Sequence, residues 1–128
     1  MEDAADASES RLVEIVYPEN TNSQGTLFGG HALSLMDRLA FIVASRHTRK
    51  PIVTASSERV EFRLPVKEGD LIDLVGRVTH VGRTSLRVSI DMYREELLTG
   101  QRDLCTTGEF LMVAVDDSGR PTPAVAGG

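Results

Sequence analysis

The sequence predicts an α+β domain in which an antiparallel sheet of about five strands packs against one long helix. Residues 31–45 contain no glycine or proline and are rich in alanine, leucine and methionine, which favour helix. Residues 53–115 instead alternate apolar and polar side chains, in short segments separated by turns. The helical stretch is apolar almost all round, so we expect it to be buried beneath the sheet.

The elements follow one another in the order β-α-β-β-β-β. A first strand is expected over residues 11–17, followed by a polar loop and a glycine turn that leads into the helix. Four strands joined by short turns follow the helix, and short connections make them antiparallel. The last strand, about 103–115, is apolar on both faces and is therefore expected to be interior. About five strands cannot surround the helix fully, so a homodimer is expected.

Length and composition indicate one domain. The chain has 128 residues, of which 41% are hydrophobic, enough for a packed core. We expect a disordered tail over residues 1–10, the domain over 11–123 and a flexible tail over 124–128. The formal charge of −5 argues against general nucleic-acid binding. No run of 18 apolar residues is present, the amino terminus is acidic and there is one cysteine, which together predict a cytoplasmic protein that binds no membrane.

Asp37 is the one carboxylate in the middle of the predicted helix. Aspartate disfavours helix interiors, and Asp37 lies too far from the helix start to cap it. Its neighbours at helical spacing include Leu33, Ala40 and Phe41, which offer little to pair with an ionised group. A surface carboxylate paired with an arginine is the alternative interpretation. From spacing alone, a chemical role and a structural role are equally well supported.

The sequence resembles the hotdog-fold acyl-CoA thioesterases, in the branch of YciA and brain acyl-CoA hydrolase. Four stretches carry the resemblance: PENTNSQGTLFGGHALSLMD (18–37), TASSERVEFRLPVKEGD (54–70), HVGRTSLRV (80–88) and TGEFLMVAVDDSGRPTP (107–123). The resemblance implies hydrolysis of an acyl-CoA to a free acid and CoA, with no cofactor besides the CoA of the substrate. It also implies a homodimer that assembles into a tetramer or hexamer, with the active site at the subunit interface.

The resemblance assigns catalysis to Asp37, as general base or nucleophile, and to Asn22 in the preceding loop, with the two residues supplied by opposite subunits. An Asx-turn is the structural alternative for Asn22. Gly29 and Gly30 open the helix, where unpaired N–H groups carry partial positive charge. Their lack of side chains lets a thioester carbonyl approach, and the N–H of Gly30 or His31 is expected to hold the oxyanion.

A second glycine turn is expected to bind CoA. Arg83 matches the CoA-contacting turn of the family, and its guanidinium suits phosphate. The Gly82 N–H and the hydroxyls of Thr84 and Ser85 are further candidates for the pantetheine or phosphates. Basic side chains elsewhere are interpreted as solvated surface charges: Arg63, Lys67 and Arg87.

Other functions fit the sequence less well. A hotdog hydratase or dehydratase needs an active-site histidine, and the helix face of Asp37 has none. A non-catalytic acyl-CoA-binding module would leave Asp37 without a purpose. A Cys/His hydrolase is rejected because Cys105 falls in a predicted strand, and three scattered histidines predict no metal site. The bulk of Phe41 is expected to shorten or reshape the acyl tunnel.

Overall fold

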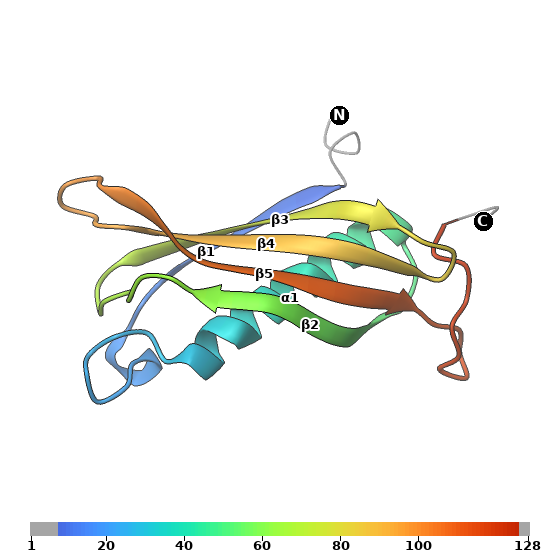
Figure 1. Cartoon of the computed structure of the whole chain (residues 1–128), viewed down its shortest axis with the longest axis horizontal. Coiled ribbons are helices and arrows are strands. Elements are labelled where there is room, and N and C mark those ends of the chain that lie inside the picture. Colours follow the sequence, from blue (N-terminus) through green and yellow to red (C-terminus); the bar gives the residue numbers. More distant parts are fainter. Residues whose placement is uncertain (1–7, 126–128) are drawn as a thin grey trace.

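The computed structural model describes residues 8–125 and has one helix lying across one sheet (Figure 1). A short 3₁₀ turn, Pro18–Asn20, precedes the helix. The main elements are β1 (Glu9–Ile15), α1 (Gly29–Thr48), β2 (Ile52–Phe62), β3 (Leu71–Val81), β4 (Ser85–Glu95) and β5 (Arg102–Ala114). The predicted α+β arrangement and order of elements are confirmed.

The five strands form a single sheet in the order β1-β3-β4-β5-β2, and every neighbouring pair is antiparallel. β5 lies between β4 and β2, so its predicted interior position is confirmed. The expectation that short turns join all four later strands is wrong for the first connection. β2 pairs with β5, and residues 63–70 carry the chain across to β3. Because of this crossover, β2 lies along the edge of β5 that would otherwise be free, and β5 becomes an interior strand.

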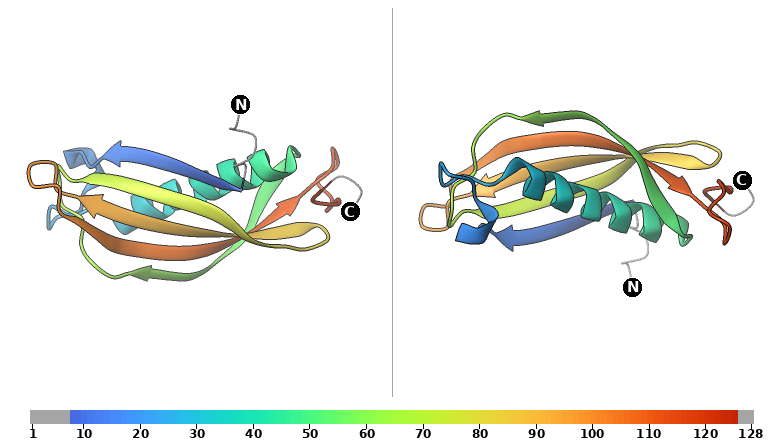
Figure 2. Two further views of the ribbon diagram at one scale, coloured as in Figure 1. Left: turned by 90° about the horizontal axis from the view of Figure 1, so that it is seen from above. Right: turned by 90° about the horizontal axis from the view of Figure 1, so that it is seen from below.

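The core lies between α1 and the sheet. α1 contacts all five strands, and Figure 2 shows it on one face of the sheet only. Two glycines let the helix approach closely: a Cβ at Gly76 would lie 3.0 Å from Val43, and one at Gly108 would lie 2.8 Å from Met36. Side chains buried on the helix side recur at helical spacing: Ala32, Leu35, Met36, Leu39, Ala40, Val43 and Ala44.

α1 is buried on one side only, in agreement with the expectation that about five strands cannot surround it. Gly30, Ser34, Arg38 and Phe41 are exposed, and Phe41 retains 48% of its surface. The reason is geometric, because a single sheet covers only the side of the helix that faces it. Asp37 lies half-buried at the border between this open face and the sheet, beside β2.

Both expected domain boundaries need correction. β1 begins at Glu9, and Ser10 is buried and accepts a hydrogen bond of 2.7 Å from Arg46, so the domain starts before residue 11. At the other end, Ala124 is fully buried, and its N–H donates to the Arg83 carbonyl at 2.9 Å. Residues 1–7 and 126–128, where the rest of the expected tails falls, lie outside the described residues.

The outer face of the sheet carries a buried carboxylate. Asp73 is only 4% exposed and bonds to Arg11 of β1 and, at 2.9 Å, to Arg102 of β5. The Arg102 guanidinium also lies 4.3 Å from the ring centre of Tyr93. Burial alone would raise the pKa of Asp73, but the hydrogen bonds and charges of the two arginines outweigh it and hold that pKa below its usual value. This group links three strands.

Candidate active site

Asp37 and Thr54 meet where α1 passes beneath the start of β2. The Thr54 hydroxyl donates a hydrogen bond of 2.6 Å to Oδ1 of Asp37. The two side chains share a hollow of about 410 Å³, called here the Asp37 hollow. Its other lining residues come from α1, β2 and β5: Gly30, Leu33, Ser34, Ser57 and Phe110. The bond to Oδ1 fixes the orientation of the carboxylate and leaves Oδ2 directed to other partners.

Sequence reasoning missed Thr54. The neighbours of Asp37 within α1 offer it no hydrogen-bond partner, as predicted. The partner, Thr54, comes from β2. Its position depends on the pairing of β2 with β5, in which Thr54 lies opposite Met112. The available signal was the polar run Thr-Ala-Ser-Ser at the start of a predicted strand, where a buried strand would be apolar.

The first turn of α1 offers one N–H group to the Asp37 hollow. The His31 N–H donates to the Phe28 carbonyl at 3.0 Å, so it already has a partner within the chain. Gly30 lines the Asp37 hollow, and no acceptor for its N–H is found within residues 8–125. Of the two expected donors, Gly30 is the one available to a ligand.

The three glycines of this region have different roles. Gly25 has a φ of +76°, so its glycine identity serves the turn. Gly29 and Gly30 are helical, and the fold has room for a side chain at both positions. A Cβ at Gly29 would lie 3.8 Å from Phe62, and one at Gly30 would lie 3.5 Å from Phe28, both ordinary contacts. The backbone turn therefore explains why residue 25 is glycine. It does not explain why residues 29 and 30 are glycine.

Asn22 lies in a separate hollow of about 720 Å³, the Asn22 hollow, together with His31. Its Oδ1 accepts hydrogen bonds from the backbone N–H groups of Gln24 and Thr26, at 2.9 and 3.2 Å, and from the Thr26 hydroxyl. The Asx-turn is therefore present. Because the oxygen is occupied by the loop, the NH₂ group is what Asn22 can offer to a ligand. Gly30 and Ser34 line both hollows, but Asp37 and Asn22 share neither.

The turn between β3 and β4 is a tight reversal, as predicted. Its Gly82 N–H donates to the Ser85 carbonyl at 2.7 Å, so this N–H already has a partner within the chain. The carbonyls of Arg83 and Thr84 accept from Ala124 and Ala114, while the Arg83 side chain is exposed. The linings of the Asp37 and Asn22 hollows include none of these four residues. Within one chain, the expected CoA turn and the candidate catalytic groups are not brought together.

The basic residues interpreted as surface charges lie on the surface. Arg87 pairs with Glu58 at 2.7 Å, Arg63 pairs with Glu61 at 3.2 Å, and Lys67 is exposed. The interpretation of Cys105 as an unreactive strand residue also agrees with its surroundings, because it is fully buried and burial raises the pKa of its thiol.

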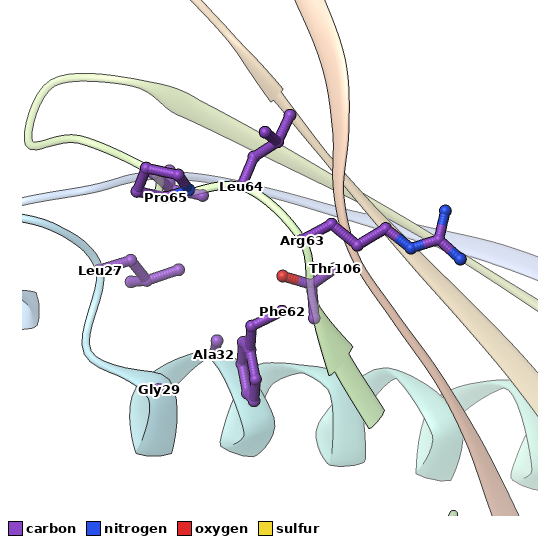
Figure 3. Close-up of a pocket in the computed structure, with 9 residues that line it drawn as sticks. Leu27, Gly29, Ala32, Phe62, Arg63, Leu64, Pro65 and Thr106 are labelled. Carbon is purple, nitrogen blue, oxygen red and sulfur yellow. The ribbon is translucent and has the colours of Figure 1, made fainter. Parts of the chain in front are cut away.

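A third hollow of about 270 Å³ lies where the start of α1 faces the connection between β2 and β3 (Figure 3). We call it the Gly29 hollow. Figure 3 shows Leu27 and Phe62 directed into it and the Arg63 guanidinium directed away. Its lining is mainly apolar: Leu27, Gly29, Ala32, Phe62, Arg63, Leu64, Pro65, Val66 and Thr106.

Comparison with known proteins identifies the family. Residues 24–101 match the model of the thioesterase superfamily. A curated relative, the uncharacterized acyl-CoA thioester hydrolase YkhA of Bacillus subtilis, is 41% identical over 117 residues, which are 90% of this chain and 68% of the relative. The chain belongs to the thioesterase superfamily, and the fold is the hotdog fold that the resemblance implied.

Solved structures agree. A hexameric acyl-CoA thioesterase in its apo form is 42% identical with a TM-score of 0.90, covering 92% of this chain and 76% of the other. An acyl-CoA hydrolase of Staphylococcus aureus, solved with butyryl-CoA and CoA, is 32% identical with a TM-score of 0.87, covering 91% and 71%.

The S. aureus enzyme has also been solved as three alanine variants. They replace an asparagine, an aspartate and a threonine, which lie 15 and 17 residues apart along that chain. Asn22, Asp37 and Thr54 have the same two separations here. No helix within residues 8–125 has the length and apolar character to cross a membrane.

Proposed function

We propose that this protein is an acyl-CoA thioesterase and that Asp37, held by Thr54, performs the hydrolysis. The observation that carries the proposal is the 2.6 Å hydrogen bond between these two side chains, in a hollow that Gly30 also lines. The relatives named acyl-CoA thioester hydrolase support the substrate class. The asparagine, aspartate and threonine spacing of the S. aureus variants supports the choice of residues.

In the proposed reaction, Oδ2 of Asp37 acts on the thioester in one of two ways. As a general base it takes a proton from water, whose oxygen then attacks the thioester carbon. As a nucleophile it attacks that carbon itself and forms an anhydride that water hydrolyses. In both routes the carbon–sulfur bond breaks, and CoA leaves as a thiolate that takes up a proton. The Thr54 hydrogen bond serves both routes by holding the carboxylate in one orientation.

The Gly30 N–H is proposed to stabilise the negative oxygen of the tetrahedral intermediate. It sits in the first turn of a helix, where the dipole adds partial positive charge. The absence of a side chain at Gly30 lets the carbonyl oxygen approach this N–H. Since the fold has room for a Cβ there, close approach of a ligand is the reason we propose for this glycine.

We infer that a second copy of the chain completes the site. Asn22 and Asp37 line different hollows in one chain, and the face of α1 that borders Asp37 is open. A partner whose Asn22 loop covers that face would bring the carboxamide NH₂ to the thioester or to the water. Assembly agrees with the hexameric state of a similar solved structure. In this assembly we propose that the exposed Arg83 contacts the CoA phosphates. We also propose that the protein is located in the cytoplasm.

The test is release of free thiol from a panel of acyl-CoAs, with wild type and Asp37→Asn compared. We expect turnover by the wild type and a loss of at least ~100-fold in the variant, the effect of removing a positioned base. Binding of acyl-CoA without hydrolysis would favour the binding-module alternative. Activity that survives in Asp37→Asn would show that another residue performs the chemistry.

A further inference from the structure

The Gly29 hollow has no assigned role in the hydrolysis itself. Apolar groups from the helix, the preceding loop and the β2–β3 connection line it, among them Leu27, Ala32 and Val66. Phe62 forms one wall and keeps 57% of its surface exposed, so its ring is available to a ligand. Because Arg63 is paired with Glu61 and points away, the hollow suits an uncharged apolar ligand (Figure 3).

One polar group faces this apolar space. Thr106 is only 2% exposed, and Figure 3 shows its hydroxyl oxygen directed into the hollow. A hydrogen bond from this hydroxyl to the Cys105 thiol lowers the pKa of that thiol, although burial, the stronger effect, raises it. Because a hydroxyl has one donor and two acceptor sites, it can also bond to a polar group on a ligand that fills the hollow.

The position of the hollow connects it to the proposed reaction centre. Gly29 lines it, and the next residue, Gly30, lines both the Asp37 and the Asn22 hollows. A Cβ at Gly29 would point at Phe62, so the missing side chain opens the hollow at its helix end. A thioester carbonyl bound to the Gly30 N–H would thus lie one residue from the mouth of the hollow.

We propose that the Gly29 hollow receives the acyl chain of the substrate and that Thr106 favours chains bearing a hydroxyl or keto group. This inference rests on the proposed thioesterase function. The volume sets the length: since an apolar cavity of about 150 Å³ holds benzene, about 270 Å³ holds roughly ten carbon atoms. The substrate class is a medium-chain acyl-CoA with a polar substituent on the chain.

The length of the chain is tested by filling the hollow. Leu27 points across it, so Leu27→Trp is compared with Leu98→Trp, the same exchange at a fully exposed leucine of the β4–β5 hairpin. The readout is kcat/KM for acetyl-, hexanoyl-, decanoyl- and palmitoyl-CoA. We expect the decanoyl-to-acetyl ratio to fall at least ~tenfold in Leu27→Trp, the scale of overfilling a pocket, and to stay at the wild-type value in Leu98→Trp.

The polar preference is tested with Thr106→Val, which keeps the shape and removes the hydroxyl. The substrates are hexanoyl-CoA and its 3-hydroxy and 5-hydroxy derivatives. We expect the wild type to prefer one hydroxy derivative, and the preference to fall ~fivefold to tenfold in the variant, as expected for one lost hydrogen bond. Equal preference in wild type and Thr106→Val would overturn the role of Thr106.

The outcomes separate this inference from the proposed function. If the wild type hydrolyses the acyl-CoA thioesters and Asp37→Asn does not, the proposed thioesterase function is supported. An unchanged chain-length profile in a folded Leu27→Trp, judged by circular dichroism, then overturns the acyl pocket alone. A profile that shifts in Phe41→Ala and not in Leu27→Trp would also overturn it, because the chain would then lie along the open face of α1. If the wild type hydrolyses none of the esters, both proposals fall.

Discussion

At the scale of single residues, the Thr54 hydroxyl is the most direct handle on the proposed chemistry. Thr54 is exposed, so Thr54→Val leaves the core intact while removing the donor to Asp37. We expect kcat to fall roughly ten- to hundredfold with little change in KM, because the carboxylate loses its orientation. Thr54→Ser keeps the hydroxyl and should retain most of the rate. Equal rates for the serine and valine variants would remove Thr54 from the mechanism.

The candidate site was partly predictable at this scale. Asn22, Gly30 and Asp37 lie within one short stretch of sequence, so their spacing can be recognised as a motif. Thr54 could not be placed, because it reaches Asp37 only through the pairing of β2 with β5. The choice between the N–H groups of Gly30 and His31 also depended on the structure, since the bond from His31 to Phe28 is a detail of how the helix starts.

At the scale of elements, α1 is pressed directly onto the backbone of β3. A Cβ at Gly76 would lie 2.8 Å from Ile90, 3.0 Å from Val43 and 3.1 Å from Leu39. Gly76→Ala should therefore lower the free energy of unfolding by about 1–3 kcal/mol, as overpacking does. Urea denaturation measures this. Gly30→Ala is the matched control, where the new methyl meets only ordinary contacts and helix propensity favours alanine. Equal midpoints for the two variants would contradict the close packing.

The Asp73 group ties β1, β3 and β5 together in a pH-dependent way. Its folded pKa is lowered, so its contribution to stability is present above the unfolded pKa of about 3.9 and is lost as the pH falls through the folded value. Asp73→Asn should cost about 1.5–3 kcal/mol at pH 7, the value of hydrogen bonds to a charged group. Unfolding of this variant should also depend less on pH below about 4.

A second carboxylate on the same face provides the control for Asp73. Asp91 lies 3.8 Å from Arg77 and is more exposed, so Asp91→Asn should change stability by less than about 0.5 kcal/mol. Denaturation midpoints measured between pH 2 and 7, roughly spanning carboxylate titration, compare the two variants. Indistinguishable acid profiles would show that the buried group contributes no special stability.

The helix and the strands were largely predictable from the sequence, but the order of the strands in the sheet was not. Alternating residues such as Leu86, Val88 and Ile90 define β4 from sequence, because one face of the strand is buried. Periodicity does not say which strand lies beside which. The crossover that places β2 next to β5 is decided by where residues 63–70 can run, and there the N–H groups of Arg63 and Leu64 bond to the Cys105 carbonyl.

At the scale of the whole molecule, the proposed division of the site between two copies has a sharp test. Asp37→Asn and Asn22→Ala are each inactive alone in this proposal. In a mixed dimer, one site would carry both substitutions and the other would carry neither. Random mixing should therefore restore about a quarter of the wild-type activity, as two-fold symmetry requires. Recovery requires subunit exchange or co-expression, and no recovery in a proven mixed dimer would place both residues in one chain.

The buried Cys105 thiol can report on unfolding, because it is protected from thiol reagents in the folded protein. It is the single cysteine of the chain, it is fully buried in β5, and its thiol donates to the Met92 carbonyl at 3.2 Å. With burial raising its pKa, the thiol is a poor nucleophile while β4 and β5 stay paired. A chromogenic disulfide that detects liberated CoA should therefore receive no background from the folded protein. The same dye, used without substrate, would time the opening of the sheet.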